Sequence, residues 1–239
     1  MDMIPRDFPP FPERNDIDLY AHLVPAKEVG GDLYDFFLLS NKLYFILGDV
    51  SGKGVPASMF MAVVCRTFRT VAVYFQELSE IVSVLNDCLA MRNESSMFCT
   101  AFIGVLNLES GRLEYCNAGH NPPFVLSSTN EVEMMTVKSN LPLGLFEQFP
   151  YETQQIQWAE GDSLFLYTDG VTEAENENLQ LYSEERLYEK LKQLSGELPE
   201  QIVGAVFEDV HRHAEKAEQS DDITVMCLKY QPKVNGNRK

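Results

Sequence analysis

Four apolar segments of strand length begin or end with aspartate, and this recurrence limits how the chain can fold. A single aspartate beside glycine is an ordinary turn signal, because the carboxylate accepts backbone hydrogen bonds and glycine supplies positive φ, and that interpretation stays open for each site alone. Together they favour a fold that gathers carboxylates at one edge, where they repel unless cations lie among them. The residues are Asp32, Asp49, Asp169 and the adjacent Asp221 and Asp222.

The order of the predicted elements favours an α+β sandwich of antiparallel sheets covered by helices. Successive strands separated by short turns are typical of an antiparallel meander, and two pairs of helices interrupt them. Segment 41–50 is almost wholly apolar and is therefore predicted to be buried on both faces. The predicted helices run from Pro56 to about Gln76, from Ser79 to about Met91, and over about 183–194 and 199–218; the predicted strands include 17–26, 41–50, 97–108, 113–120, 122–128, 151–158, 162–170 and 223–230.

The charge of the chain narrows the classes of partner. Its 239 residues carry 36 acidic against 19 basic side chains, a formal net charge of −17, which argues against a nucleic-acid groove or an anionic membrane as the partner. Most of the excess is expected on a solvated surface, and a minority at a cation site. Carboxylate oxygens are hard ligands that select Mg²⁺, Mn²⁺ or Ca²⁺, and no histidine and cysteine set has the spacing of a zinc site.

Cysteine and hydropathy patterns predict a reducing, cytoplasmic setting. The five cysteines form an odd set without a C-x-x-C pair, and each lies in an apolar stretch. The apolar run 59–65 is far shorter than a bilayer span, and no leader-like segment opens the chain. We expect a linker over 1–17, one domain over 18–231 and a disordered tail over 232–239. In the alternative interpretation, this domain is the cytoplasmic catalytic part of a larger sensor protein, even one anchored in a membrane.

Six short motifs occur in order across roughly residues 20–230 and together resemble a known family. They are PAKEVGGDLYDFF, LGDVSGKGVPASMFMA, NAGHNPPFVL, LPLG, FLYTDGVTEA and SDDITV. This set is similar to that of the PPM family of metal-dependent serine/threonine protein phosphatases, in its bacterial branch of SpoIIE and RsbU type. The resemblance implies an α-β-β-α sandwich of two antiparallel sheets with two Mn²⁺ or Mg²⁺ ions at one end. It also implies that a metal-activated water removes phosphate from phosphoserine or phosphothreonine.

The resemblance assigns roles to the acidic residues. Asp49 is expected to bridge both ions, and the expected ligands on one side are Asp32 and the carbonyl of Val50. Asp169 and Asp221 are the expected ligands on the other side, with Asp222 as the alternative to Asp221.

The general acid stays open, because Val50 and Ser51 stand where many eukaryotic relatives have histidine. His120 is a weaker candidate for this role, and the alternative for it is a simple turn. Lys53 contacts phosphate in one interpretation and is solvated in the other.

Family resemblance further implies the substrate, a phosphorylated STAS-domain protein in a partner-switching circuit. Two other classes of function stay open: a phosphatase-like binding or regulatory module, and a calcium-stabilised structural domain, although the D-x-D-x-D-G loop is absent. The apolar helix predicted over 57–76 is expected behind the metal edge. It is either a core helix or one covered in part by an upstream linker or by a second subunit, which would make a homodimer.

Overall fold

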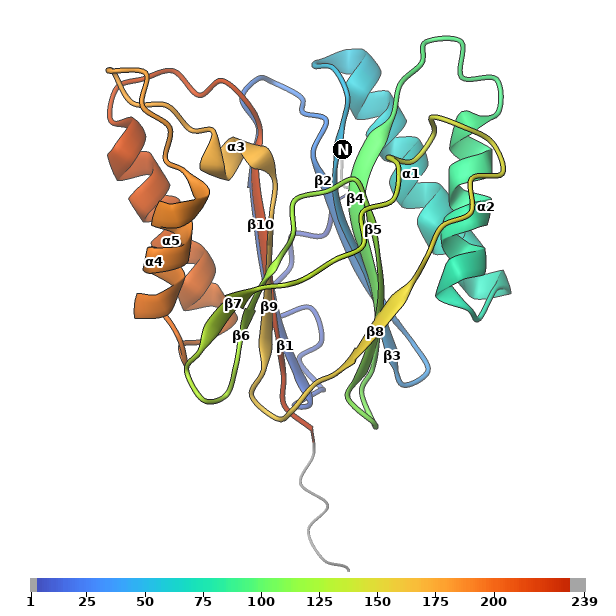
Figure 1. The fold of residues 1–239 in the computed structure, drawn as a ribbon, viewed down its shortest axis with the longest axis horizontal. Helices are drawn as coiled ribbons and strands as arrows, with labels where there is room; N and C mark the ends of the chain where they lie inside the picture. The colour runs from blue at the N-terminus through green and yellow to red at the C-terminus, as the bar shows by residue number, and fades with distance from the viewer. Residues whose placement is uncertain (1–3, 233–239) are drawn as a thin grey trace, which may run out of the picture.

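Ten strands form two antiparallel five-stranded sheets in residues 4–232, the part of the chain that the structure, a computed structural model, describes. The two sheets lie face to face (Figure 1). The first has the strand order β1 (Ile17–Val24), β10 (Ile223–Tyr230), β9 (Ser163–Tyr167), β6 (Phe124–Leu126) and β7 (Val132–Met134). The second has the order β2 (Leu33–Leu39), β3 (Lys42–Val50), β4 (Cys99–Asn107), β5 (Arg112–Ala118) and β8 (Gln154–Gln157).

Helices cover the outer face of each sheet. Helices α1 (Val55–Tyr74) and α2 (Leu78–Ala90) lie on the second sheet, and α4 (Glu184–Gln193) and α5 (Pro199–Ala214) on the first (Figure 1). The short helix α3 (Asp169–Thr172) follows β9 directly. The predicted sandwich of two antiparallel sheets flanked by helices is therefore confirmed.

Three apolar layers fill this sandwich, and β3 contributes to two of them. Phe45 and Leu47 belong to the layer between the sheets, while Tyr44 and Ile46 point the other way, into the layer under α1 and α2. Successive side chains of a strand alternate between its faces, so an almost wholly apolar strand needs a core on both sides. The prediction that this strand is buried on both faces is confirmed.

The four main helices agree with the sequence prediction except at their ends. Helix α5 ends at Ala214 and not at 218, because Glu215 has a φ of 50° and a ψ of −99°, which are not helical. The sequence patterns did not predict β7 and α3, since elements of three and four residues are shorter than the stretch over which a strand or helix period can be recognised.

Helix α1 has one buried and one exposed apolar face. Val64, Phe68 and Ala72 pack into the core under the helix, whereas Met59 and Val63 are exposed. Among the described residues, α1 is the one helix long and apolar enough to span a membrane, a test that core helices of soluble proteins also pass. It packs against β2, β3 and α2.

The segment before β1 packs onto the domain. Phe8 and Phe11 contact Phe36 of β2, and the Tyr34 hydroxyl donates to the carbonyl of Pro5 at 2.7 Å. The predicted boundaries of linker and domain stay predictions, and the predicted tail lies outside the described residues beyond position 232. Four cysteine thiols are buried and free, as expected of small apolar side chains; the fifth, Cys88, is exposed.

Candidate metal centre

The two sheets bring the predicted carboxylates to one end of the sandwich. Asp32 precedes β2 and Asp49 lies at the end of β3, both in the second sheet. Asp169 follows β9, and Asp221 and Asp222 precede β10, both in the first sheet. Antiparallel pairing of β2 with β3 and of β9 with β10 places these ends together, because the end of one strand lies beside the start of its neighbour.

Asp32 is buried and held by the facing sheet. Its Oδ2 accepts hydrogen bonds from the hydroxyls of Thr168, at 2.8 Å, and Thr224, at 2.5 Å. Burial raises the pKa of Asp32 well above its usual value, and the charge of Asp49 raises it further. The hydroxyl bonds oppose that shift and fix the orientation of the carboxylate.

Asp49 lies at the centre of the acidic group. Burial raises its pKa from 3.8 to about 7, with further contributions from the charges of Asp169, Asp221 and Asp222 in that order. Burial and the charge of Asp221 likewise raise the pKa of Asp169. These carboxylates therefore destabilise one another's ionised forms, which is the condition that a bound cation relieves.

Asp221 and Asp222 are neighbours with different surroundings. The Asp221 carboxylate accepts a hydrogen bond from the Lys53 ammonium at 2.9 Å, and both side chains are partly exposed. The carboxylate of Asp222 is buried and accepts backbone N–H groups from Ala26 at 2.8 Å and Gly31 at 2.7 Å. Asp222 thus anchors the loop that leads into Asp32.

Glycines at this end allow the chain segments to approach closely. A Cβ on Gly30 would lie 2.1 Å from Asp222 Oδ2, and a Cβ on Gly170 would lie 1.9 Å from the Asp222 carbonyl oxygen. A Cβ on Gly31 would lie 2.9 Å from the carbonyl oxygen of Val50, the predicted backbone ligand. The glycines beside the aspartates are therefore required by packing at this edge.

His120 is a structural link and not an available acid. Its Nε2 lies 3.1 Å from the carbonyl oxygen of Tyr167 on β9, and its Nδ1 lies 3.1 Å from the hydroxyl of Thr100 on β4. Because a carbonyl can only accept, Nε2 carries the proton and Nδ1 accepts from Thr100. Burial lowers the pKa of His120 to about 4, so the imidazole is neutral and ties the two sheets together.

Three threonines that hold Asp32 or His120 in place were not predicted from the sequence: Thr100, Thr168 and Thr224. Thr168 lies directly after β9 and before Asp169. Thr224 follows the Asp221–Asp222 pair by two positions and lies in β10, the neighbour of β9 in the first sheet. Both motifs have a polar residue at the end of an otherwise apolar strand, and this repetition could have indicated the threonines.

The sequence analysis also did not predict the pair of Asp35, fully buried on β2, and Arg69 of α1. The Arg69 guanidinium donates to both carboxylate oxygens of Asp35 at 2.5 and 2.6 Å.

The donor set fits a hard divalent cation. It consists of carboxylates with a backbone carbonyl close by, the oxygen ligands that Mg²⁺, Mn²⁺ and Ca²⁺ prefer, and its members raise one another's pKa values. As the side chains stand in residues 4–232, no three His, Cys, Asp or Glu residues are close enough together to hold one ion. Binding of one ion by three of these side chains would therefore require them to move toward it.

Comparison with solved structures identifies the class of fold. The SiaA-PP2C domain of Pseudomonas aeruginosa superposes with a TM-score of 0.79 at 17% identity, covering 89% of this chain and 86% of that domain. Magnesium-bound RsbX aligns with a TM-score of 0.68 at 18% identity, over 91% of this chain and 98% of RsbX. The catalytic domain of PstP in complex with two manganese ions gives 0.60 at 15% identity, over 90% and 98%. The chain has the fold of these PP2C phosphatase domains.

Sequence comparison then gives the family. The model of the family described as Stage II sporulation protein E (SpoIIE) matches residues 40–231, so the chain belongs to the SpoIIE family. Protein IcfG of Synechocystis sp. is 30% identical over 247 residues, which cover 91% of this chain and 38% of IcfG. Phosphoserine phosphatase RsbU of Bacillus subtilis is 29% identical over 167 residues, which cover 70% of this chain and 50% of RsbU. The chain thus spans half or less of the length of these relatives.

Proposed function

We propose that this chain is a metal-dependent protein phosphatase that removes phosphate from phosphoserine or phosphothreonine of a partner protein. The observation that carries the proposal is the carboxylate group at one end of the sandwich, whose members come from both sheets and raise one another's pKa values. Membership of the SpoIIE family and the name of the relative RsbU, a phosphoserine phosphatase, support the same activity.

The proposed ligands of two Mn²⁺ or Mg²⁺ ions follow from their positions. Asp49, which has carboxylates on several sides, is the proposed bridge. Asp32 and the Val50 carbonyl would serve one side, and Asp169 and Asp221 the other. We assign this last position to Asp221 because the Asp222 carboxylate is already occupied by the backbone N–H groups of Ala26 and Gly31. Two ions are supported by the manganese complex of PstP, which has the same fold.

The residues of the chain would prepare the site before catalysis. Thr168 and Thr224 orient Asp32, and Lys53 balances the charge of Asp221. When bound, the cations supply a Lewis acid and a water nucleophile at neutral pH. Neutral His120 holds the ends of β4 and β9 in register with the carboxylates and gives no proton to the leaving group.

The proposed substrate is a phosphorylated STAS-domain protein in a partner-switching pathway. Support comes from the relative RsbU and from the similar structure of the RsbU and RsbW domains of Rv1364c from Mycobacterium tuberculosis. A similar fold also occurs in a structure from the bacterial stressosome. Free, buried cysteines support a reducing, cytoplasmic location.

We also propose that the exposed apolar face of α1 contacts a second copy of the chain. Met59, Val63, Val73 and Tyr74 are exposed on this helix, and exposed apolar side chains that gather on one surface often mark an interaction site. Sedimentation velocity of the wild type and of Val63→Glu tests the proposal. A dimer that becomes a monomer in the variant is expected, and equal sedimentation of the two proteins contradicts it.

The activity is tested by hydrolysis of p-nitrophenyl phosphate and of a phosphoserine peptide with and without Mn²⁺. EDTA should abolish turnover, and Asp49→Asn should lower it by about 1,000-fold or more, because the bridging ligand serves both ions. Asp18→Asn is the matched control, since Asp18 lies opposite Lys229 in the register of β1 and β10, at the other end of the sandwich. Wild-type turnover in Asp49→Asn would refute the two-metal assignment.

A further inference from the structure

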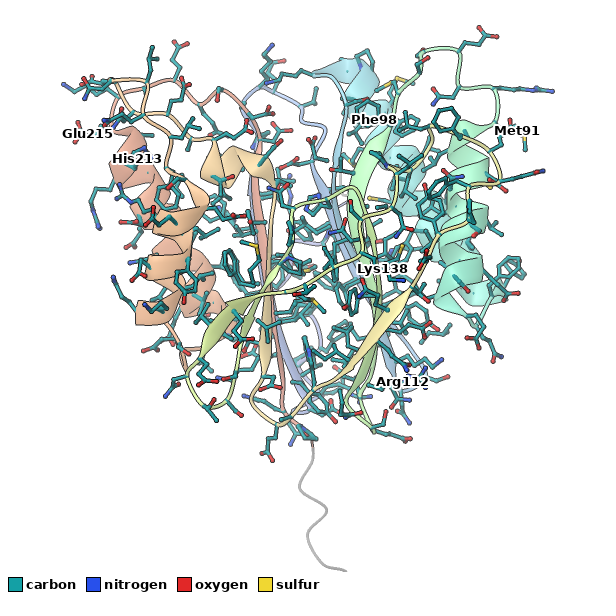
Figure 2. The ribbon with its side chains drawn as sticks, in the orientation of Figure 1. Met91, Phe98, Arg112, Lys138, His213 and Glu215 are labelled. Atoms are coloured by element: carbon teal, nitrogen blue, oxygen red, sulfur yellow. The ribbon has the colours of Figure 1, made fainter. Side chains whose placement is uncertain are left out.

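A cavity of about 430 Å³ adjoins the carboxylate site and has no role in the chemistry described above. It lies between the end of α5, the residues after α3 and the loop that leads to Asp221. Gly170 and Asp221 line it and also belong to the metal edge, so the two sites share a wall. Figure 2 shows Glu215, one of its lining residues, where α5 ends, and α3 at the same end of the sandwich.

The walls of the cavity are apolar. Phe207, Val210 and Ala214 of α5 face Val24 and Ile223, which pair with each other across β1 and β10. The volume is at the low end of the range of about 300–1,000 Å³ for ligand pockets, which suits one or two side chains better than a large cofactor.

The mouth of the cavity is acidic. Glu175, Glu208, Glu215 and Glu218 line it and are exposed, and none of the four forms an ion pair within residues 4–232. Lysine and arginine are absent from the described lining. The carbonyl end of α5 also lies here, and the helix dipole favours cations at this end, where the last turn carries His211, Arg212 and His213.

The loop that forms one side of the cavity is fixed in place. The side-chain amide of Gln219 donates to the carbonyl of Val24 at 2.8 Å and to the carbonyl of Asp221 at 2.7 Å. The positive φ of Glu215 turns the chain from α5 into this loop. The cavity and Asp221 are thus held by the same segment, and an occupant of the cavity lies beside the acidic site.

We propose that this cavity binds the substrate protein beside its phosphorylated residue, taking an apolar side chain next to a lysine or arginine. The inference rests on the proposed phosphatase function and adds to it a sequence preference. An apolar side chain matches the walls, and a neighbouring cation matches the four unpaired glutamates at the mouth. The phosphate itself is repelled by that mouth, which directs it toward the metal side.

The first test compares two phosphoserine peptides that differ only beside the phosphoserine, one carrying Leu-Arg and one carrying Ser-Glu. With Mn²⁺, wild type should hydrolyse the Leu-Arg peptide with a kcat/KM about tenfold higher, mainly through KM. Ala214→Phe fills the cavity, and Glu208→Lys/Glu218→Lys reverses two charges at its mouth. Both variants should bring the ratio of the two kcat/KM values toward one without changing turnover of p-nitrophenyl phosphate. Glu94→Lys/Glu147→Lys is the charge-matched control. An unchanged ratio in both cavity variants overturns the proposal.

The second test separates this proposal from the proposed function. Fluorescence anisotropy with a labelled, unphosphorylated Leu-Arg peptide needs no catalysis. Wild type should bind it at least about fivefold more tightly than Ala214→Phe or, if that variant does not fold, Ala217→Phe. Equal affinities overturn the docking site even if the enzyme is active. Preferential binding without any Mn²⁺-dependent hydrolysis would retain the docking site and refute the phosphatase function.

Discussion

Asp32 and Asp221 lie at the same end of the sandwich, yet the protein holds them in opposite ways. Asp32 is buried, and two threonine hydroxyls from the facing sheet hold its Oδ2. The Asp221 side chain is 41% exposed, and its partner Lys53 is 49% exposed. The fold therefore orients Asp32 in advance, whereas Asp221 has a partner that it can exchange for another cation. The sheets fix the half of the site that contains Asp32, whereas the half that contains Asp221 is completed when a cation binds.

Among the substitutions that compare the two halves of the site, the largest effect is expected when each of the two adjacent aspartates is replaced in turn. Asp221→Asn should lower Mn²⁺-dependent turnover by about 100-fold or more, because it removes a proposed ligand of one ion. Asp222→Asn should destabilise the fold by about 1–3 kcal/mol, because its carboxylate holds the backbone of the loop before β2, with less than about tenfold loss of turnover. Phosphatase assays and urea unfolding measure both. The reverse order of activity losses would reassign the ligand.

The pH dependence of stability should depend on the metal. The raised pKa of Asp49, about 7, means that the folded protein binds this proton more tightly than the unfolded chain does. The resulting stabilisation is complete below about pH 4 and is lost as the pH rises through about 7. In EDTA the Tm should therefore fall between about pH 5 and 8, and Mn²⁺ should restore it at the upper end.

Asp49→Asn provides the control for this pH effect. The variant should show a smaller fall of Tm over the same range in EDTA, because the titrating group is gone. Identical pH profiles for wild type and variant would show that another group is responsible.

A smaller loss is expected from Thr168→Val, which removes one hydroxyl that binds Asp32. A buried carboxylate left without one of its donors should cost about 1–3 kcal/mol in urea unfolding. Thr70→Val is the matched control, since the Thr70 hydroxyl donates to the carbonyl of Arg66 on the exposed side of α1. This substitution should change stability by about 0.5 kcal/mol or less. Equal effects of the two substitutions would show that the Thr168 hydroxyl does not hold Asp32 in place, and Asp32 would then not differ from Asp221 in this respect.

The smallest change in stability is expected from Lys53→Met. An exposed ion pair contributes about 0–1 kcal/mol, so unfolding should barely change. Mn²⁺ should bind somewhat more tightly, because the ammonium no longer competes for Asp221; calorimetric titration measures this. Weaker Mn²⁺ binding, or a raised KM for p-nitrophenyl phosphate with unchanged metal affinity, would instead support a contact between Lys53 and phosphate.

The sequence predicted what depends on periodic patterns and on a series of motifs. The two-sided burial of β3 follows from its apolar run, and the positions of Asp32, Asp49 and Asp169 at strand ends follow from the adjacent glycines. The bonds from Thr168 and Thr224 to Asp32 could not be predicted, because they join residues more than 130 positions apart through the packing of two sheets. The same holds for the pair of Asp35 and Arg69, which depends on where α1 crosses β2.

The close approach of Asp222 to Gly30 and Gly170 affects how a mutational scan of this protein would look. A methyl group at either glycine would overlap Asp222, and in Gly170 the obstacle is backbone that cannot rotate away. Both positions should therefore tolerate as few substitutions as the carboxylates themselves, although neither glycine has a side chain that could meet a substrate. In a screen scored by activity alone, residues that only make room would be indistinguishable from residues that react.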